Sequence, residues 1–199
     1  MIKISLTDFV DIASKSGTPK ATKVAQVKAR PDYDPRFDFY KPIREQIIEV
    51  HRAGQEGASL RVFLRTLTDR KKAANYPELI DGYLKWLGRK AVRWFQPPRK
   101  FYHSSGVDLI VNPELCVSFG RETYVIKLYF KDDPLDRFKA EVILSLMEHV
   151  LRPHCAEGAV MSVMDVRRAK LFPWRASSKS RIALVDAELA YISTLWPRV

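Results

Sequence analysis

The segment GVDLIVNPELCVSFGRETYVIKLYF, residues 106–130, decides how the fold is interpreted. Apolar and β-branched residues dominate three short runs within it, and such runs predict strands. The runs are 107–111, 115–119 and 122–130. Gly120-Arg121 separates the last two and predicts a hairpin turn between them. We therefore expect a sheet in the middle of the chain, in which the strand at Val107 neighbours the strand at Glu122.

The sequence on either side of this segment predicts helices and one further strand. Towards the C-terminus we expect a helix over 135–151, a strand over 159–166 and a helix over 182–195. Towards the N-terminus, apolar residues at helical spacing predict an almost wholly helical region of about 90 residues. The elements expected there are a short helix from Ser5 or Thr7, a second over 20–30, and helices over 42–54, 59–72 and 77–88, with a linker at 31–35.

This order of elements predicts an α+β or α/β fold around a mixed sheet. We expect two parts, a basic and mostly helical region over 1–92 and a mixed-sheet domain with flanking helices over 93–199. The apolar runs are too short for a membrane span, and nothing at the N-terminus resembles an export signal. Two cysteines are too few for a disulfide framework, so we expect a cytoplasmic protein.

Charge supplies the first indication of function. The 199 residues include 34 basic and 23 acidic side chains, a formal net charge of +11, and most of the excess lies in residues 1–100. Such a field attracts polyanions, and DNA or RNA is the partner that we expect. The basic residues are interleaved with aromatic ones, a mixture that can neutralise phosphates and stack bases. Taken singly, however, we expect each aromatic residue, including Trp86, Trp94 and Phe95, to fill the core. We expect the contact residues to be Lys85, Arg89, Lys90, Arg93, Arg99, Lys100, Arg167, Arg168, Lys170 and Arg175.

Asp108 on one expected strand and Lys127 on another suggest a metal-dependent phosphodiesterase, in which carboxylates hold a cation and a lysine steadies developing charge. Over residues 95–170 the chain resembles the PD-(D/E)xK nuclease superfamily, which has the restriction-endonuclease-like fold. The resemblance implies that Asp108 is the first acid and a metal ligand, that Lys127 is the lysine, and that Mg²⁺ or Mn²⁺ is the cofactor.

The second acid of the motif is missing, because Val125 occupies its position. Glu122 or Glu141 could replace it, as could Glu45 or Glu49 from an earlier helix. Three interpretations stay open: an active nuclease with a migrated site, an inactive relative kept for binding, or a fold without such a site. In the third, Asp108 caps a strand end and Lys127 lies at a sheet edge with its stem packed and its ammonium in water. A non-enzymatic module that docks a protein partner is the alternative of a different class, and an exposed apolar face on the 77–88 helix would favour it.

Overall fold

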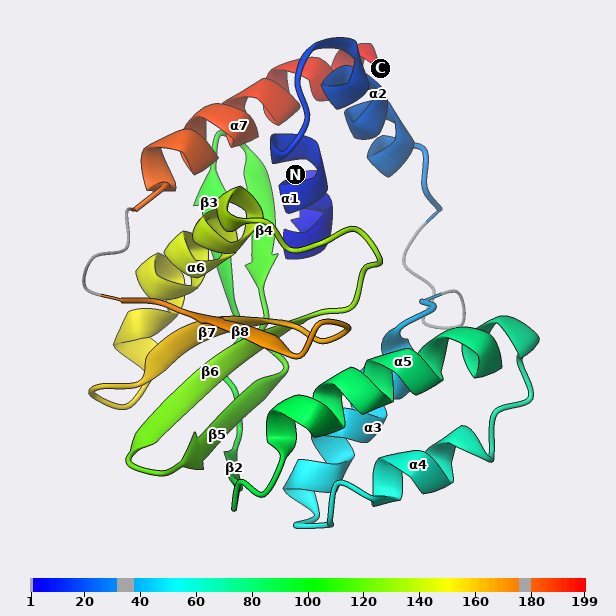
Figure 1. The fold of residues 1–199 in the computed structure, drawn as a ribbon. Coiled ribbons are helices and arrows are strands. Elements are labelled where there is room, and N and C mark those ends of the chain that lie inside the picture. Colours follow the sequence, from blue (N-terminus) through cyan, green and yellow to red (C-terminus); the bar gives the residue numbers. More distant parts are fainter. Residues whose placement is uncertain (1, 32–37, 176–179) are drawn as a thin grey trace.

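Helices and two sheets make up an α+β fold (Figure 1). The structure is a computed structural model that describes residues 2–31, 38–175 and 180–199. The helices are α1 Leu6–Ala13, α2 Gly17–Lys28, α3 Lys41–Arg52, α4 Ser59–Leu64, α5 Arg70–Leu87, α6 Arg137–Leu151 and α7 Ile182–Leu195. The strands are β1 Ile2–Ser5, β2 Arg93–Phe95, β3 Lys100–Ser104, β4 Val107–Val111, β5 Leu115–Phe119, β6 Glu122–Tyr129, β7 Val160–Asp165 and β8 Lys170–Pro173.

The larger sheet has five strands in the order β2-β5-β6-β7-β8. β6 and β7 are parallel and are joined through α6, while the other neighbours are antiparallel, so the sheet is mixed. The expected hairpin between β5 and β6 is confirmed, with Leu115 opposite Ile126. The smaller sheet has three strands in the order β1-β4-β3.

The strand at Val107 and the strand at Glu122 are not neighbours, so that expectation was wrong. β4 pairs with β1 and β3 in the smaller sheet, whereas β6 pairs with β5 and β7 in the larger one. Pro113 lies between β4 and β5 and has no amide hydrogen to donate to a ladder. The chain thus leaves one sheet at this point and enters the other.

One interrupted strand borders both sheets. Residues 93–104, which we call the outer strand, contain β2 and β3 and pair antiparallel with β5 and β4 in turn. Phe95 lies opposite Cys116 and Lys100 opposite Val111, so equal numbers of residues separate the two pairs on each side. The outer strand is therefore half of one long hairpin, and it occupies an edge of each sheet.

The larger sheet is covered on both faces. α3 and α5 pack on one face, where Leu115, Val117 and Ile126 join their apolar side chains in one core. α6 covers the other face, and a second core there joins it to α1, α7 and the inner face of the smaller sheet. Figure 1 shows α6 and α5 on opposite sides of the strands.

Residue 92 does not separate two cores. β1 pairs with β4, α1 shares a core with α6, and α3 and α5 share a core with the larger sheet. The N-terminal region is mostly helical, as expected, but each of its parts completes the packing of a sheet. The linker expected at 31–35 lies mainly outside the described residues.

Several helices have different bounds from those expected. α2 begins at Gly17 rather than at residue 20. The single helix expected over 59–72 is divided into α4 and the start of α5, because Asp69 accepts hydrogen bonds from the amides of Lys71 and Lys72 and so caps a new helix. Pro77, expected to open a helix, lies inside α5 instead. Among the described residues, no helix is long and apolar enough to cross a membrane.

Candidate nucleic-acid interface

The residues expected to form a metal site do not meet. Asp108 lies on β4, where its Oδ1 is 2.6 Å from Nδ1 of His103 on the outer strand. Lys127 lies on β6 in the other sheet. The resemblance implied that Asp108 and Lys127 share one site. That expectation was wrong, because β4 and β6 belong to different sheets.

The four acids considered as replacements have partners of their own. On α3, Glu45 pairs with Lys41 at 3.5 Å and Glu49 pairs with Arg52. Glu122 is exposed at the start of β6 and accepts a hydrogen bond from Tyr124. Glu141 on α6 pairs with Arg137 at 2.8 Å and Arg181 at 2.5 Å, and these two guanidinium groups lower the pKa of its carboxyl group. None of these four acids is bonded to Lys127.

Lys127 instead belongs to a buried cluster that sequence reasoning missed. Its Nζ donates to Oε1 of Glu114 at 2.6 Å and to the backbone oxygen of Asn112 at 3.0 Å. The second carboxylate oxygen of Glu114 accepts from the amide of Leu128 at 2.7 Å. Glu114 and Lys127 are only 7% and 8% exposed.

This cluster does not fit a Mg²⁺ or Mn²⁺ ion. Both oxygens of Glu114 already accept hydrogen bonds from the protein, and the position of the second acid is held by Val125, which is fully buried. No group of three or more metal-binding side chains occurs in the part of the chain that the structure describes. Hard cations require several oxygen ligands, so we derive no cleavage step from this site.

The expected phosphate contacts divide into two sets, and the set along the outer strand has no carboxylate partners. Between Asp81 and Asp108 the chain carries no acidic residue. Among the described residues, all six cations of this segment are exposed and have no carboxylate within 4.0 Å, and we call the five other than Lys90 the basic edge. They are Lys85, Arg89, Arg93, Arg99 and Lys100.

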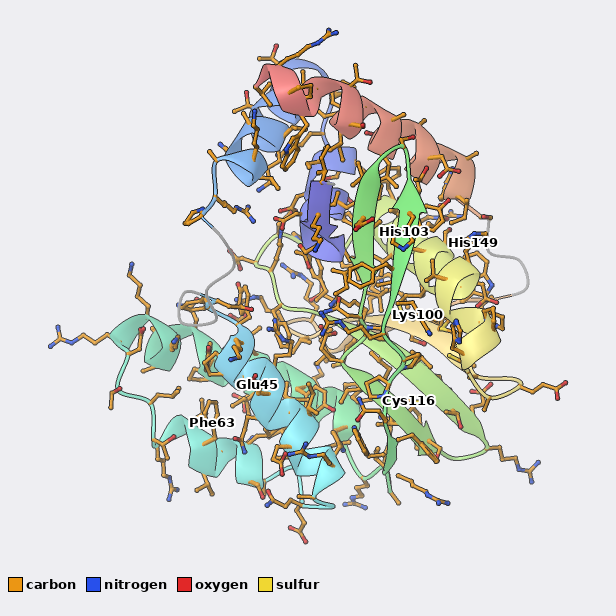
Figure 2. The ribbon with its side chains drawn as sticks, turned by 180° about the vertical axis from the view of Figure 1, so that it is seen from behind. Glu45, Phe63, Lys100, His103, Cys116 and His149 are labelled. Atoms are coloured by element: carbon orange, nitrogen blue, oxygen red, sulfur yellow. The ribbon has the colours of Figure 1, made fainter. Side chains whose placement is uncertain are left out.

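The basic edge runs from the end of α5 to β3. Lys85 is in the last turn of α5, whose C-terminal end lies close to β2 in Figure 1. Figure 2, seen from behind, shows Lys100 and His103 along the outer strand. Lys90 also lies here, but it donates to the backbone oxygen of Trp86 and lies 5.0 Å from the centroid of the Trp86 ring. Lys90 therefore anchors the end of α5.

The second set is largely neutralised by the protein itself. Arg167 pairs with Glu78 and lies 3.6 Å from Asp132, and its side chain is almost wholly buried. Arg168 is 3.3 Å from Asp165. Lys170 lies over the ring of Phe172, and Arg175 also has an interaction within the protein. These four residues offer less free charge than the basic edge.

Two phenylalanines are exposed on the outer strand, whereas the aromatic residue next to each is partly buried. Phe95 is 37% exposed and Phe101 is 46% exposed. The neighbouring Trp94 and Tyr102 point inward and are partly buried against the two cores. Tyr102 donates to Asp186 on α7 at 2.7 Å, and burial together with this carboxylate raises its pKa to about 12.

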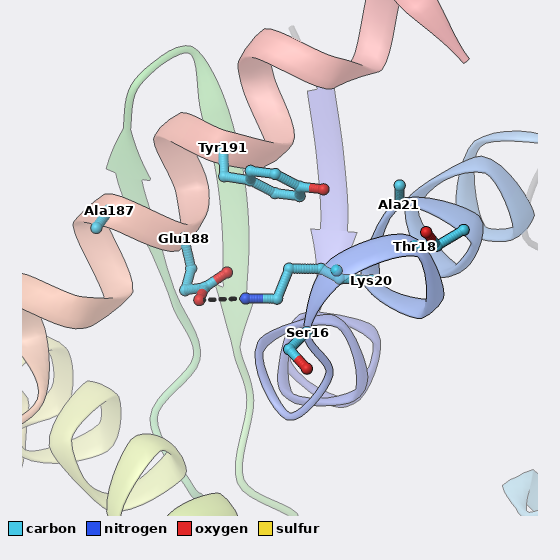
Figure 3. A pocket seen from close by; sticks show the side chains of 8 residues that line it. Ser16, Thr18, Lys20, Ala21, Ala187, Glu188 and Tyr191 are labelled. Atoms are coloured by element: carbon cyan, nitrogen blue, oxygen red, sulfur yellow. Dashed lines mark hydrogen bonds and ion pairs between the residues drawn. The ribbon is translucent and has the colours of Figure 1, made fainter.

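A hollow of about 540 Å³ lies between the start of α2 and α7 (Figure 3). Lys20 on its wall donates to Glu188 at 2.6 Å and lies 5.6 Å from the ring centroid of Tyr191. Because the lysine is already neutralised, this hollow presents less positive potential than the basic edge.

No protein-family model matches the chain, and no curated protein matches its sequence significantly.

Proposed function

We propose that this protein binds DNA or RNA through the phosphate backbone, and that the basic edge is the contact surface. The observation that carries the proposal is the row of exposed cations on the outer strand and the end of α5 that have no carboxylate partners among the described residues. Cations already paired within a protein must lose that partner before they contact a phosphate. Unpaired ones release counterions from the polymer directly.

The chemistry of the basic edge favours binding without strong sequence preference. Its cations are spread along an extended strand and a helix end, and phosphate contacts carry no direct sequence information. Base-specific contacts in a major groove usually require a helix or a β-ribbon that presents several polar side chains to the base edges. The outer strand carries few uncharged polar side chains of the kind that read bases: Gln96, His103 and Ser104, of which Ser104 already donates to Asp186.

The proposal concerns binding, and it includes no cleavage, because the cluster around Lys127 does not fit a cation. The resemblance to the nuclease superfamily stays a prediction, and β5, β6, α6 and β7 follow one another in the order that it implies. The two cysteines are free, which supports the further proposal of a cytoplasmic location.

The protein-docking alternative has less support. The observation that would favour it was an exposed apolar face on the helix over 77–88. Leu79, Ile80 and Tyr83 of α5 are instead fully buried against the larger sheet and its neighbouring helices.

Salt dependence tests the proposal directly. If the five cations of the basic edge each neutralise one phosphate, the logarithm of the association constant for duplex DNA falls with the logarithm of salt concentration with a slope of about −4.5. Fluorescence anisotropy with a labelled duplex at several salt concentrations measures this slope. Absence of binding at low salt, or an affinity that is indifferent to salt, contradicts the proposal.

A further inference from the structure

The outer strand combines cations with exposed aromatic rings. Phe95 and Phe101 are two of the few large apolar side chains that the described residues leave exposed. Each has a nitrogenous side chain against its ring. The guanidinium carbon of Arg93 is 5.2 Å from the ring centroid of Phe95, and the ring centroids of Phe101 and His103 are 6.0 Å apart with 26° between their planes.

Strand alternation keeps the ring of Phe101 outside. Successive side chains of a strand point to opposite faces, so Phe101 points away from the face that holds Tyr102. Tyr102 is fixed inward by its hydrogen bond to Asp186 and by an edge contact with His149 on α6, 5.6 Å between ring centroids. The ring of Phe101 therefore cannot occupy the inward position that Tyr102 holds. In β2, Trp94 packs against the core that includes α5. Phe95 is on the other face beside Cys116, and its ring stays 37% exposed there because β2 is an edge strand.

We propose that the outer strand binds a single-stranded segment of nucleic acid, with bases stacked on Phe95 and Phe101 and phosphates at Arg93, Arg99 and Lys100. This inference rests on the proposed function and specifies its ligand. Aromatic rings stack on exposed bases of any sequence, while cations beside them follow the backbone. The bases of a duplex are stacked on one another and offer no free face to either ring.

A second occupant of an edge strand would be a peptide that adds a strand to the sheet. The outer strand is poorly suited to it, because Pro97 and Pro98 interrupt it and supply no amide hydrogens. The local excess of positive charge favours a polyanion over an average peptide.

The test compares two substitutions that remove aromatic rings at sites of similar exposure. The double variant Phe95→Leu/Phe101→Leu keeps apolar side chains and every cation of the basic edge. The control is Tyr191→Leu on α7, where the ring is 37% exposed and also lies near a lysine, Lys20. Each protein is titrated into a labelled single strand of about 12 nucleotides, as DNA and as RNA, and into a DNA duplex of the same sequence.

We expect the wild-type protein to bind the single strands more tightly than the duplex. The double variant should lose at least about tenfold in single-strand affinity, because each stacked base contributes measurably, while its duplex affinity stays within about twofold. Tyr191→Leu should change neither affinity. The DNA and RNA arms show which strand is preferred.

Several results overturn the inference. If the wild-type protein binds the duplex with the expected salt dependence and shows no preference for single strands, the inference fails and the proposed function stands. The same holds if the double variant binds single strands like the wild type, or if it loses both affinities equally. Tighter binding of an unfolded peptide than of any oligonucleotide would instead assign the outer strand to a protein partner. If no nucleic acid binds at low salt, both proposals fail.

Phe101→Trp provides a further control, because it keeps an aromatic ring. It should retain single-strand affinity, and a loss of that affinity in this variant would also contradict stacking.

Discussion

Replacing Glu114 by alanine is expected to lower the free energy of unfolding by about 3–5 kcal/mol, because it leaves the Lys127 ammonium buried without a counter-charge. Glu114 is the only carboxylate within 4.0 Å of Lys127 among the described residues, and the substitution also removes the acceptor of the Leu128 amide. Chemical denaturation followed by circular dichroism measures the loss. Domains are stable by only about 5–15 kcal/mol, so the variant should be visibly less stable at room temperature.

A double-mutant cycle provides the control. Lys127→Met alone leaves a buried carboxylate that still accepts from Leu128, and Glu114→Ala/Lys127→Met removes both charges. Because the two side chains touch, the double variant should be markedly more stable than the sum of the single losses implies. A loss below about 1 kcal/mol for Glu114→Ala, or strict additivity of the two substitutions, would show that the pair is solvated.

Gly82→Ala is expected to destabilise the protein by about 3 kcal/mol or more, although alanine has the higher helix propensity. A Cβ atom at position 82 would lie 2.1 Å from the backbone oxygen of Val166 and 2.9 Å from that of Arg167. Backbone atoms of the β7–β8 turn cannot move aside as a side chain can, so α5 would be displaced from the sheet. Thermal unfolding measures the effect.

Gly57→Ala is the matched control. A Cβ atom there would meet the ends of two leucine side chains, Leu84 and Leu87, at 2.8 Å. Those ends can rotate, and the cost should therefore be clearly smaller than at Gly82. A neutral or stabilising effect of Gly82→Ala would contradict the close packing of α5 against the β7–β8 turn.

The parts of the fold with local signals could be predicted from the sequence. β5 and β6 are joined by Gly120-Arg121, and both are rich in β-branched and aromatic residues. β1 was missed because it has four residues and finds its partner, β4, about a hundred residues further along the chain. The outer strand was missed because Pro97-Pro98 and its charged residues hide the alternation of buried and exposed side chains.

Part of the buried cluster could also have been found. The hairpin register places Leu115 opposite Ile126, so continuing it by one residue places Glu114 opposite Lys127. That register, rather than the motif spacing, identifies the partner of the lysine. Asp108 was chosen because it also lies on a strand, and nothing in the sequence marks the passage of the chain from one sheet to the other.

The division of the cations into two sets could not be predicted. Arg167 and Arg99 are both arginines, and the sequence does not show which of them is paired. Glu78 reaches Arg167 only because α5 packs beside the β7–β8 turn. The low exposure of Arg167 follows from the same packing. Free and neutralised charges differ only through tertiary contacts.

The central claim is tested most directly by removing three cations from the basic edge and three from elsewhere. Arg93→Gln/Arg99→Gln/Lys100→Gln changes unpaired cations, and Arg52→Gln/Arg61→Gln/Arg137→Gln changes exposed ones that pair with carboxylates. Both variants lower the net charge by three. We predict that the first weakens binding to nucleic acid and reduces the magnitude of the salt slope by about 3, while the second leaves the slope nearly unchanged. Equal losses in the two variants, or no loss in the first, would contradict a localised basic edge.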